Sequence, residues 1–290
     1  SAISRYSNTQ NKVQEMDFSS NHPFHVKLQQ LAETIWTPGE HSKWFYERAK
    51  GQWEVARLRE GTTAALQRKF DDTKPKKQKL DKALIAKAIN CWDQHPDIVS
   101  GGAQKSFVHL MENVSKAGES WEPDKRYFQQ TVAKVILYKK TYEIVRKQKF
   151  EGYWANIVAY TMALLAHRTA GRLDLMKIWE DQGITPSLEE TLRNWTGLVH
   201  EGFIAYAGDR NVTQVCKKRV CWVHIQTHVD CSFAENLQDE LGNGMPLPNV
   251  GSTKKKNLTE EEARRQHKVM SHTAEDFFAM QQWGNDTGNA

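Results

Sequence analysis

Apolar residues recur at helical spacing along most of this chain. In the segment 24–35 they stand three or four positions apart, the repeat that places side chains on one face of an α-helix. A longer stripe of this kind consists of Phe128, Val132, Val135, Tyr138, Tyr142 and Val145. The run 153–167 is apolar on nearly every side, which is typical of a fully buried helix. Alternating strand patterns are scarce, so we expect a mainly α fold, with helical domains and few or no strands.

Capping residues and prolines set the expected limits of these helices. Pro75 forbids a helix through the loop 71–79, and Asp81 is placed to cap a helix over 82–92. Ser187 and Glu190 have the spacing of a capping box at the start of another long helix. We expect residues 212–233 to continue as one helix, and a last helix to run from about 259 to 283.

Composition shifts suggest how the chain is organised. We expect a core segment over 1–115, a helical domain over 116–242, a linker over 243–257, and a C-terminal helix and tail over 258–290. The chain begins "SAIS" without an initiator methionine, so we take it to be a fragment or a processed form.

The segment 43–60, "KWFYERAKGQWEVARLRE", is the densest in aromatic and charged residues. On a helical wheel one face carries Phe45, Ala49, Trp53 and Ala56, and the opposite face carries Glu47, Lys50, Glu54 and Arg57. The charged residues stand three or four apart, where opposite charges stabilise an exposed helix face. The pattern predicts one amphipathic helix with Glu47 on its solvent side.

A third group in this segment is explained neither by packing nor by those ion pairs. Trp44, Arg48, Gln52, Val55 and Arg59 lie on the flank of the predicted helix. Gly51 nearby costs a helix interior about 1 kcal/mol relative to alanine, which suggests a close approach to the backbone. A guanidinium is suited to a phosphate or a carboxylate. Two interpretations therefore stay open for Arg48: a bound anion, or a carboxylate inside the fold.

Charge is concentrated in one part of the chain. The 290 residues carry a net charge of +5, whereas residues 43–79 alone contain eleven Lys and Arg against five Asp and Glu. A basic segment on a nearly neutral body is compatible with a phosphate-bearing partner, and equally with a solvated lysine-rich loop. Four cysteines without a signal peptide indicate a reducing cytoplasm, and no run is long enough to span a membrane.

Several stretches in chain order resemble the AIPR family, the abortive-infection phage-resistance proteins of bacteria. They include "NTQNKVQEMDF", "NHPFHVKLQQLAETIWTPG", "KWFYERAKGQWEVAR" and "NVTQVCKKRVCW", and the resemblance covers roughly residues 1–230. It implies a component of antiviral defence, encoded beside restriction-modification or helicase/ATPase genes that supply candidate partner subunits. Many members carry a nuclease-like domain upstream of the matched region, so nuclease activity does not transfer to this chain.

The sequence contains few motifs that indicate catalysis or metal binding. A metal-dependent nuclease core usually needs an acidic residue followed by Asp/Glu-x-Lys on adjacent strands. We expect no Asp/Glu-x-Lys motif in this chain and few strands, so an intrinsic nuclease of this type is not expected. No phosphate-binding glycine loop or nucleophile elbow is present, so no cofactor is expected. Cys221, His224, His228 and Cys231 would share one face of a helix, but a straight helix cannot wrap four ligands around one zinc ion. The default expectation is therefore no metal.

Three functions follow from these observations. The first is a non-catalytic helical module that binds DNA, RNA or a partner protein; its candidate binding residues are Asn11, Trp44, Arg48, Gln52, Arg59, Gln104 and Lys105. The second is a catalytic core that cuts or modifies nucleic acid, with Asn8, Gln10, Asn11, Arg48, Gln52 and Gln104 in one pocket and Glu47 as its acid or base. The third is a structural scaffold whose aromatic residues only form core.

Overall fold

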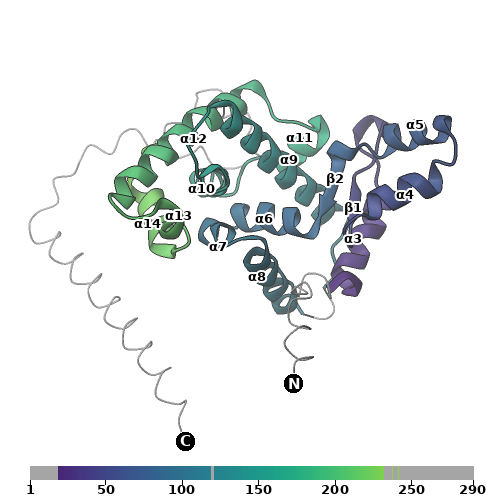
Figure 1. Cartoon of the computed structure of the whole chain (residues 1–290), viewed down its shortest axis with the longest axis horizontal. Helices are drawn as coiled ribbons and strands as arrows, with labels where there is room; N and C mark the ends of the chain where they lie inside the picture. The colour runs from purple at the N-terminus through teal and green to yellow at the C-terminus, as the bar shows by residue number, and fades with distance from the viewer. Residues whose placement is uncertain (1–18, 119–120, 232–236, 238–240, 242–290) are drawn as a thin grey trace, which may run out of the picture. The chain divides into compact units, whose positions relative to one another are not determined.

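The fold is mainly α, as the hydrophobic pattern predicts. The computed structural model describes residues 19–118, 121–231, 237 and 241, and within them it contains twelve α-helices and two short strands (Figure 1). The predicted linker 243–257 and the predicted C-terminal helix and tail over 258–290 lie outside these residues.

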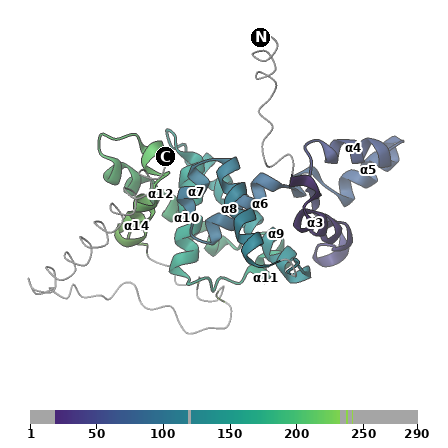
Figure 2. The ribbon, with the colours of Figure 1, turned by 90° about the horizontal axis from the view of Figure 1, so that it is seen from below.

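A helical bundle forms most of the described structure (Figures 1 and 2). Its longer helices are α6 (Lys82–Trp92), α8 (Ala103–Lys116), α9 (Lys125–Lys147), α10 (Trp154–Arg168) and α12 (Pro186–Ala207). Shorter helices complete it: α7 (Pro96–Ser100), α11 (Leu175–Asp181), α13 (Val212–Val215) and α14 (Arg219–His228). α10 packs against α6, α7, α9, α12 and α14, which makes it the centre of the bundle.

The central position of α10 follows from its sequence. Every residue from Asn156 to Ala166 is buried, because a helix that is apolar all round is stable only where other elements cover it on every side. The Tyr160 hydroxyl, which cannot reach water there, donates a hydrogen bond of 2.8 Å to the Cys216 carbonyl. None of the helices in the described part of the chain is long and apolar enough to cross a bilayer.

Helix limits agree with the predictions where a local capping residue sets them. The Asp81 carboxylate accepts a bond of 2.8 Å from the Leu84 amide, so the predicted cap of α6 is confirmed. The predicted capping box of α12 is wrong. Pro186 is the first residue of that helix, and the hydroxyl of Thr185 before it accepts from the Leu188 amide at 3.2 Å. A proline in the first turn fixes the start of the helix one residue before Ser187.

The single helix predicted over 212–233 is also wrong. α13 ends at Val215 and α14 begins at Arg219. The Cys216 carbonyl between them accepts its hydrogen bond from Tyr160 of α10. A carbonyl turned toward another helix in this way is not directed along its own helix axis, and the chain bends at this point.

The remaining elements form an N-terminal lobe. It consists of α3 (Pro23–Thr34), β1 (Phe45–Glu47), α4 (Gln52–Glu60), α5 (Ala64–Thr73) and β2 (Lys79–Asp81), with short 3₁₀ turns η2 (Ser19–Asn21), η3 (Pro38–Glu40) and η4 (Lys76–Gln78). The two strands are parallel, and Phe45, Tyr46 and Glu47 pair with Lys79, Leu80 and Asp81 in that order.

The prediction of one amphipathic helix over 43–60 is wrong. Residues 45–47 form a strand, and α4 starts at Gln52 after a turn in which Gly51 has a φ of 87°. On the predicted wheel Glu47 faced solvent, yet it is only 5% exposed. Pairing with β2, 34 positions further along the chain, holds residues 45–47 in an extended conformation. The turn that follows requires a left-handed backbone at position 51, which glycine adopts without a steric penalty.

Side-chain hydrogen bonds join the lobe to the bundle. The Trp44 indole N–H donates to Gln182 Oε1 at 2.7 Å, directly after α11. Lys139 of α9 donates to the carbonyls of Lys77 and Lys79 at 2.8 and 3.2 Å. Buried apolar residues of α3, β1 and β2 belong to one continuous core with the bundle, so elements on both sides of position 115 pack together. Trp53 of α4 and Phe70 of α5 are buried outside this core.

Gly51 and Gly197 allow a paired test of this turn. Gly51→Ala is expected to lower the free energy of unfolding by about 1 to 2 kcal/mol, because its backbone is left-handed although a methyl group there would meet no other atom. Gly197 lies inside α12 with equally open space around it, so Gly197→Ala is expected to raise stability by up to about 1 kcal/mol. Urea denaturation measures both. A neutral or stabilising Gly51→Ala would contradict the turn.

Candidate functional site

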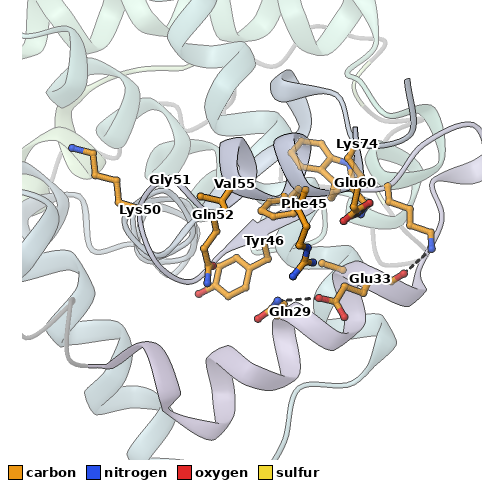
Figure 3. Close-up of a pocket in the computed structure, with 15 residues that line it drawn as sticks. Gln29, Glu33, Phe45, Tyr46, Lys50, Gly51, Gln52, Val55, Glu60 and Lys74 are labelled. Carbon is orange, nitrogen blue, oxygen red and sulfur yellow. Dashed lines mark hydrogen bonds and ion pairs between the residues drawn. The ribbon is translucent and has the colours of Figure 1, made fainter. Parts of the chain in front are cut away.

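A cleft of about 480 Å³ lies in the N-terminal lobe. α3 contributes Gln29, Ala32 and Glu33, and α4 contributes Gln52, Val55, Ala56, Arg59 and Glu60. The strand β1 and its approach supply Lys43, Trp44, Phe45 and Tyr46, while Lys50, Gly51 and Lys74 complete the lining (Figure 3). The sides of the cleft are therefore two helices, with the strand between them.

The buried carboxylate of Glu47 holds the α4 side of the cleft in place. Its Oε1 accepts hydrogen bonds from the Gly51 and Trp53 amides, both at 3.1 Å. Its Oε2 pairs with Lys79 Nζ of β2 at 3.1 Å. Amides in the first turn of a helix have no partner within the helix, and a carboxylate there also interacts favourably with the helix dipole. Glu47 thus links the start of α4 to both strands.

Gln52 forms a second part of the same turn. Its Oε1 accepts from the backbone amides of Arg48 and Ala49 at 2.8 and 3.0 Å. This fixes the orientation of the amide group, because the carbonyl oxygen is already engaged. The amide nitrogen of Gln52 makes no hydrogen bond to another residue in the described ranges and belongs to the cleft lining. It is a donor left available to a bound molecule.

Arg48 is held by neutral oxygens and pairs with no carboxylate among the residues that the structure describes. Its Nε donates to Gln29 Oε1, and its Nη1 donates to the Ser20 carbonyl at 2.9 Å. The Ser20 hydroxyl in turn donates to the Arg48 carbonyl at 3.0 Å. Arg48 does not itself line the cleft, but Gln29 and Gln52, which it contacts, both do. Its positive charge is therefore not cancelled by an ion pair in this region.

A buried histidine lies behind the strand. His25 of α3 is 1% exposed, and its Nδ1 is hydrogen-bonded to the Tyr46 hydroxyl at 2.6 Å. Burial, which is the main cause, and the nearby charges of Lys82 and Arg48 together lower the pKa of His25 from 6.5 to about 3. The imidazole is therefore neutral at physiological pH. Tyr46, which lines the cleft, is anchored by a partner that carries no charge.

The cleft lining carries more positive than negative charge. Its cations are Lys43, Lys50, Arg59 and Lys74, and its carboxylates are Glu33 and Glu60. Lys74 pairs with Glu60 at 2.9 Å, and Lys43 donates to the Glu33 carbonyl at 2.6 Å. Neither Lys50 nor Arg59 forms an ion pair within residues 19–118 and 121–231. In Figure 3 the Lys50 ammonium points away from the other labelled side chains.

The residues predicted for this site divide into three groups. Trp44, Gln52 and Arg59 line the cleft, and Arg48 contacts two lining residues. Gln104 and Lys105 lie in the first turn of α8 and are not part of the lining. Asn8, Gln10 and Asn11 lie outside the described residues. Trp44 is 4% exposed and acts mainly as core.

The prediction of a helix over 43–60 missed two residues of the cleft lining. It placed Phe45 in the core, and it did not include Val55 among the candidate binding residues. Phe45 was assigned to the core face of a helix, but it lies in β1, is half-buried and lines the cleft. No local signal in the sequence places it there, because three residues are too few to show the alternation of a strand. Val55, which is 64% exposed, lies on α4 at the cleft edge.

The residues considered for zinc do not come together as predicted. α14 ends at His228, so Cys231 is not on the helix that carries Cys221 and His224. Cys221 and Cys231 are buried, while the rings of His224 and His228 stack on each other 4.2 Å apart on a more exposed side. Within the described ranges no group of three or more His, Cys, Asp or Glu side chains is placed to hold a metal ion.

The expectation that the chain has no Asp/Glu-x-Lys motif is wrong at one place, because Asp72 and Lys74 have this spacing. Asp72 belongs to the last turn of α5 and Lys74 directly follows that helix, so neither lies on a strand. Lys74 is paired with Glu60. The arrangement therefore lacks the adjacent strands on which such carboxylates and lysines hold a magnesium ion.

The chain is similar to a known protein family. The family model described as "AIPR protein" matches residues 1–205, well over half of the 290 residues. No curated protein matches the chain, and no solved structure does either. The match includes the whole N-terminal lobe and the cleft.

Replacing Glu47 tests its structural role. Glu47→Gln is expected to lower the free energy of unfolding by about 2 to 4 kcal/mol, because Lys79 loses a buried partner. Glu54 forms an exposed pair with Lys76 at 3.3 Å, so Glu54→Gln is expected to cost less than about 1 kcal/mol. Equal losses for the two variants in urea denaturation would show that Glu47 does not fix the turn.

The lowered pKa of His25 leads us to expect that the stability of the fold decreases in acid. The unfolded imidazole titrates near 6.5 and the folded one near 3, so between these values only the unfolded chain binds the proton. Stability is therefore retained above pH 6.5 and falls below it, by up to about 1.4 kcal/mol per pH unit.

His25→Gln keeps an acceptor for Tyr46 without a titrating group and is expected to flatten this dependence. His41 is exposed, so His41→Gln serves as the control and leaves the slope unchanged. Free energies of unfolding are measured from about pH 7 down to about pH 4.5 for the unaltered protein and both variants. Parallel curves of free energy against pH for all three would show that His25 does not cause the acid sensitivity.

Proposed function

The chain belongs to the AIPR family, and from this membership and the charge of its N-terminal lobe we propose that it is a helical module that binds nucleic acid. The family is that of abortive-infection phage resistance, which indicates a role in phage defence. The binding surface is the basic segment 43–79, and its ligand is the phosphate backbone of DNA or RNA.

The observation that carries this proposal is an excess of cations that the fold does not neutralise. Four of the eleven basic residues in 43–79 form ion pairs: Arg57 with Asp71, Lys74 with Glu60, Lys76 with Glu54, and Lys79 with Glu47. The other seven have no ion-pair partner among the described residues; they are Lys43, Arg48, Lys50, Arg59, Arg68, Lys69 and Lys77. Unneutralised cations clustered in one lobe attract a polyanion.

Apolar side chains on the same lobe also support binding. Val55 and Leu58 of α4 are 64% and 66% exposed, and Leu66 of α5 is 42% exposed. α4 buries Trp53 and α5 buries Phe70, and these two rings pack edge to face 5.6 Å apart. The outer faces of both helices are therefore not used for packing, although they carry apolar and basic residues side by side. Such surfaces are typical of binding sites.

The position of Glu47 favours binding over catalysis. A catalytic core in this lobe would use Glu47 as its acid or base. The carboxylate is 5% exposed, is already engaged with two amides and Lys79, and does not belong to the cleft lining, so it is poorly placed to act on a bound molecule. The candidate partner subunits, a helicase/ATPase or restriction-modification components, belong to the same proposal as proteins that this module would position on nucleic acid.

Salt-dependent binding tests the proposal. The protein is expected to shift labelled DNA or RNA at about 50 mM salt and to lose affinity steeply toward about 200 mM, because each phosphate contact releases counterions. Arg59→Gln combined with Lys69→Gln is expected to weaken binding about tenfold and to reduce the slope of log affinity against log salt by about one to two. Both residues are exposed and form no ion pair in the described lobe.

A matched variant separates this surface from general charge. Arg126 and Lys147 are exposed on α9 and form no ion pair within the described ranges. Arg126→Gln combined with Lys147→Gln removes the same charge and is expected to leave affinity within about twofold. The proposal is wrong if the unaltered protein binds neither DNA nor RNA at low salt, or if the two double variants weaken binding equally.

A further inference from the structure

Building on the proposed function, we propose that the cleft between α3 and α4 holds one unstacked nucleotide of a single-stranded nucleic acid. Its base would lie on the apolar part of the lining and its phosphate against Arg59. The proposal rests on nucleic-acid binding by the lobe, and it adds the strandedness of the ligand and the place where one base is held.

The size and shape of the cleft select a single base over a duplex. Its volume of about 480 Å³ lies within the range of small-molecule sites. A double helix is read by a convex element, such as a helix or a ribbon, that enters a groove. A stacked base pair cannot enter a concave site of this size, whereas a base from a single strand can leave its stack and enter it.

The lining has one apolar part and one polar part. Phe45, Ala32, Val55 and Ala56 supply apolar contacts, and of these Phe45 has an aromatic face on which any base can stack. Gln52 presents an amide nitrogen whose orientation is fixed, because its oxygen is held by the Arg48 and Ala49 amides. That nitrogen is suited to an acceptor on the edge of a base.

Arg59 supplies the charge that a phosphate needs. It lines the cleft, it is exposed, and it pairs with no carboxylate in the part of the chain that the structure describes. The neighbouring carboxylate, Glu60, is already neutralised by Lys74 at 2.9 Å. An arginine fork can make two parallel hydrogen bonds to a phosphate. The next phosphates along the strand would meet the other unpaired cations of the lobe.

Filling the cleft without changing its charge tests this proposal. Fluorescence anisotropy is measured with a labelled single strand, in DNA and in RNA form, and with the matching duplexes at one salt concentration. The single strand is expected to bind about tenfold or more tightly than the duplex. Ala56→Trp fills the cleft and is expected to weaken single-strand binding about tenfold. Ala205→Trp, on an exposed position of α12 outside both the lobe and the cleft lining, is expected to leave it unchanged.

A second variant keeps the test valid if Ala56→Trp does not fold, which thermal unfolding reveals. Phe45→Leu removes the aromatic face but keeps an apolar side chain in β1. It is expected to weaken single-strand binding at least about fivefold with little effect on duplex binding. Lost affinity for both forms in equal measure would point to damage of the lobe and would overturn the proposal.

The outcomes separate a failure of the proposed function from a failure of the cleft proposal. If the unaltered protein binds no nucleic acid, the proposed function itself is wrong. If it binds in a salt-dependent way but prefers the duplex, or if Phe45→Leu and a folded Ala56→Trp bind the single strand normally, only the cleft proposal is overturned. In that case the basic surface alone accounts for nucleic-acid binding, and the cleft is left to a protein partner.

Discussion

The arrangement of the N-terminal lobe depends on one buried carboxylate. Glu47 ends β1, accepts hydrogen bonds from two amides at the start of α4, and pairs with a lysine of β2. A charge removed from water is stable only when such partners surround it. These partners determine where α4 begins, why Gly51 must be left-handed, and how α4 stands opposite α3. The cleft exists because this turn is held in place.

The same use of acidic residues explains the charge of the surface. Glu47, Glu54, Glu60 and Asp71 each pair with a cation within the segment 43–79. They stabilise the lobe locally, and because the segment has far fewer acids than bases, most of its cations remain unpaired in the described structure. Paired cations stabilise the lobe, and the cations without an ion-pair partner are those that the proposed phosphate-bearing ligand would contact.

The lobe and the bundle differ in how they are stabilised. α10 is covered on all sides by other helices, whereas α4 and α5 bury little beyond one aromatic ring each. The bundle thus provides most of the hydrophobic stabilisation. The lobe is fastened to it through Trp44, Lys139 and the shared core. A well-packed bundle that carries a lightly packed basic lobe is consistent with the binding module proposed above.

Sequence alone determined the helical class, the long helices α3, α6, α9 and α10, and the Asp81 cap, because helical periodicity and capping are local properties of neighbouring residues. It also located the basic segment. Three of the residues that it proposed for binding, Trp44, Gln52 and Arg59, line the cleft. It failed at β1, since three residues are too few to show an alternation and their extended form comes from pairing with β2 far along the chain. The burial of Glu47, the place of Phe45 and the break after α13 were likewise decided only by tertiary contacts, which no local pattern contains.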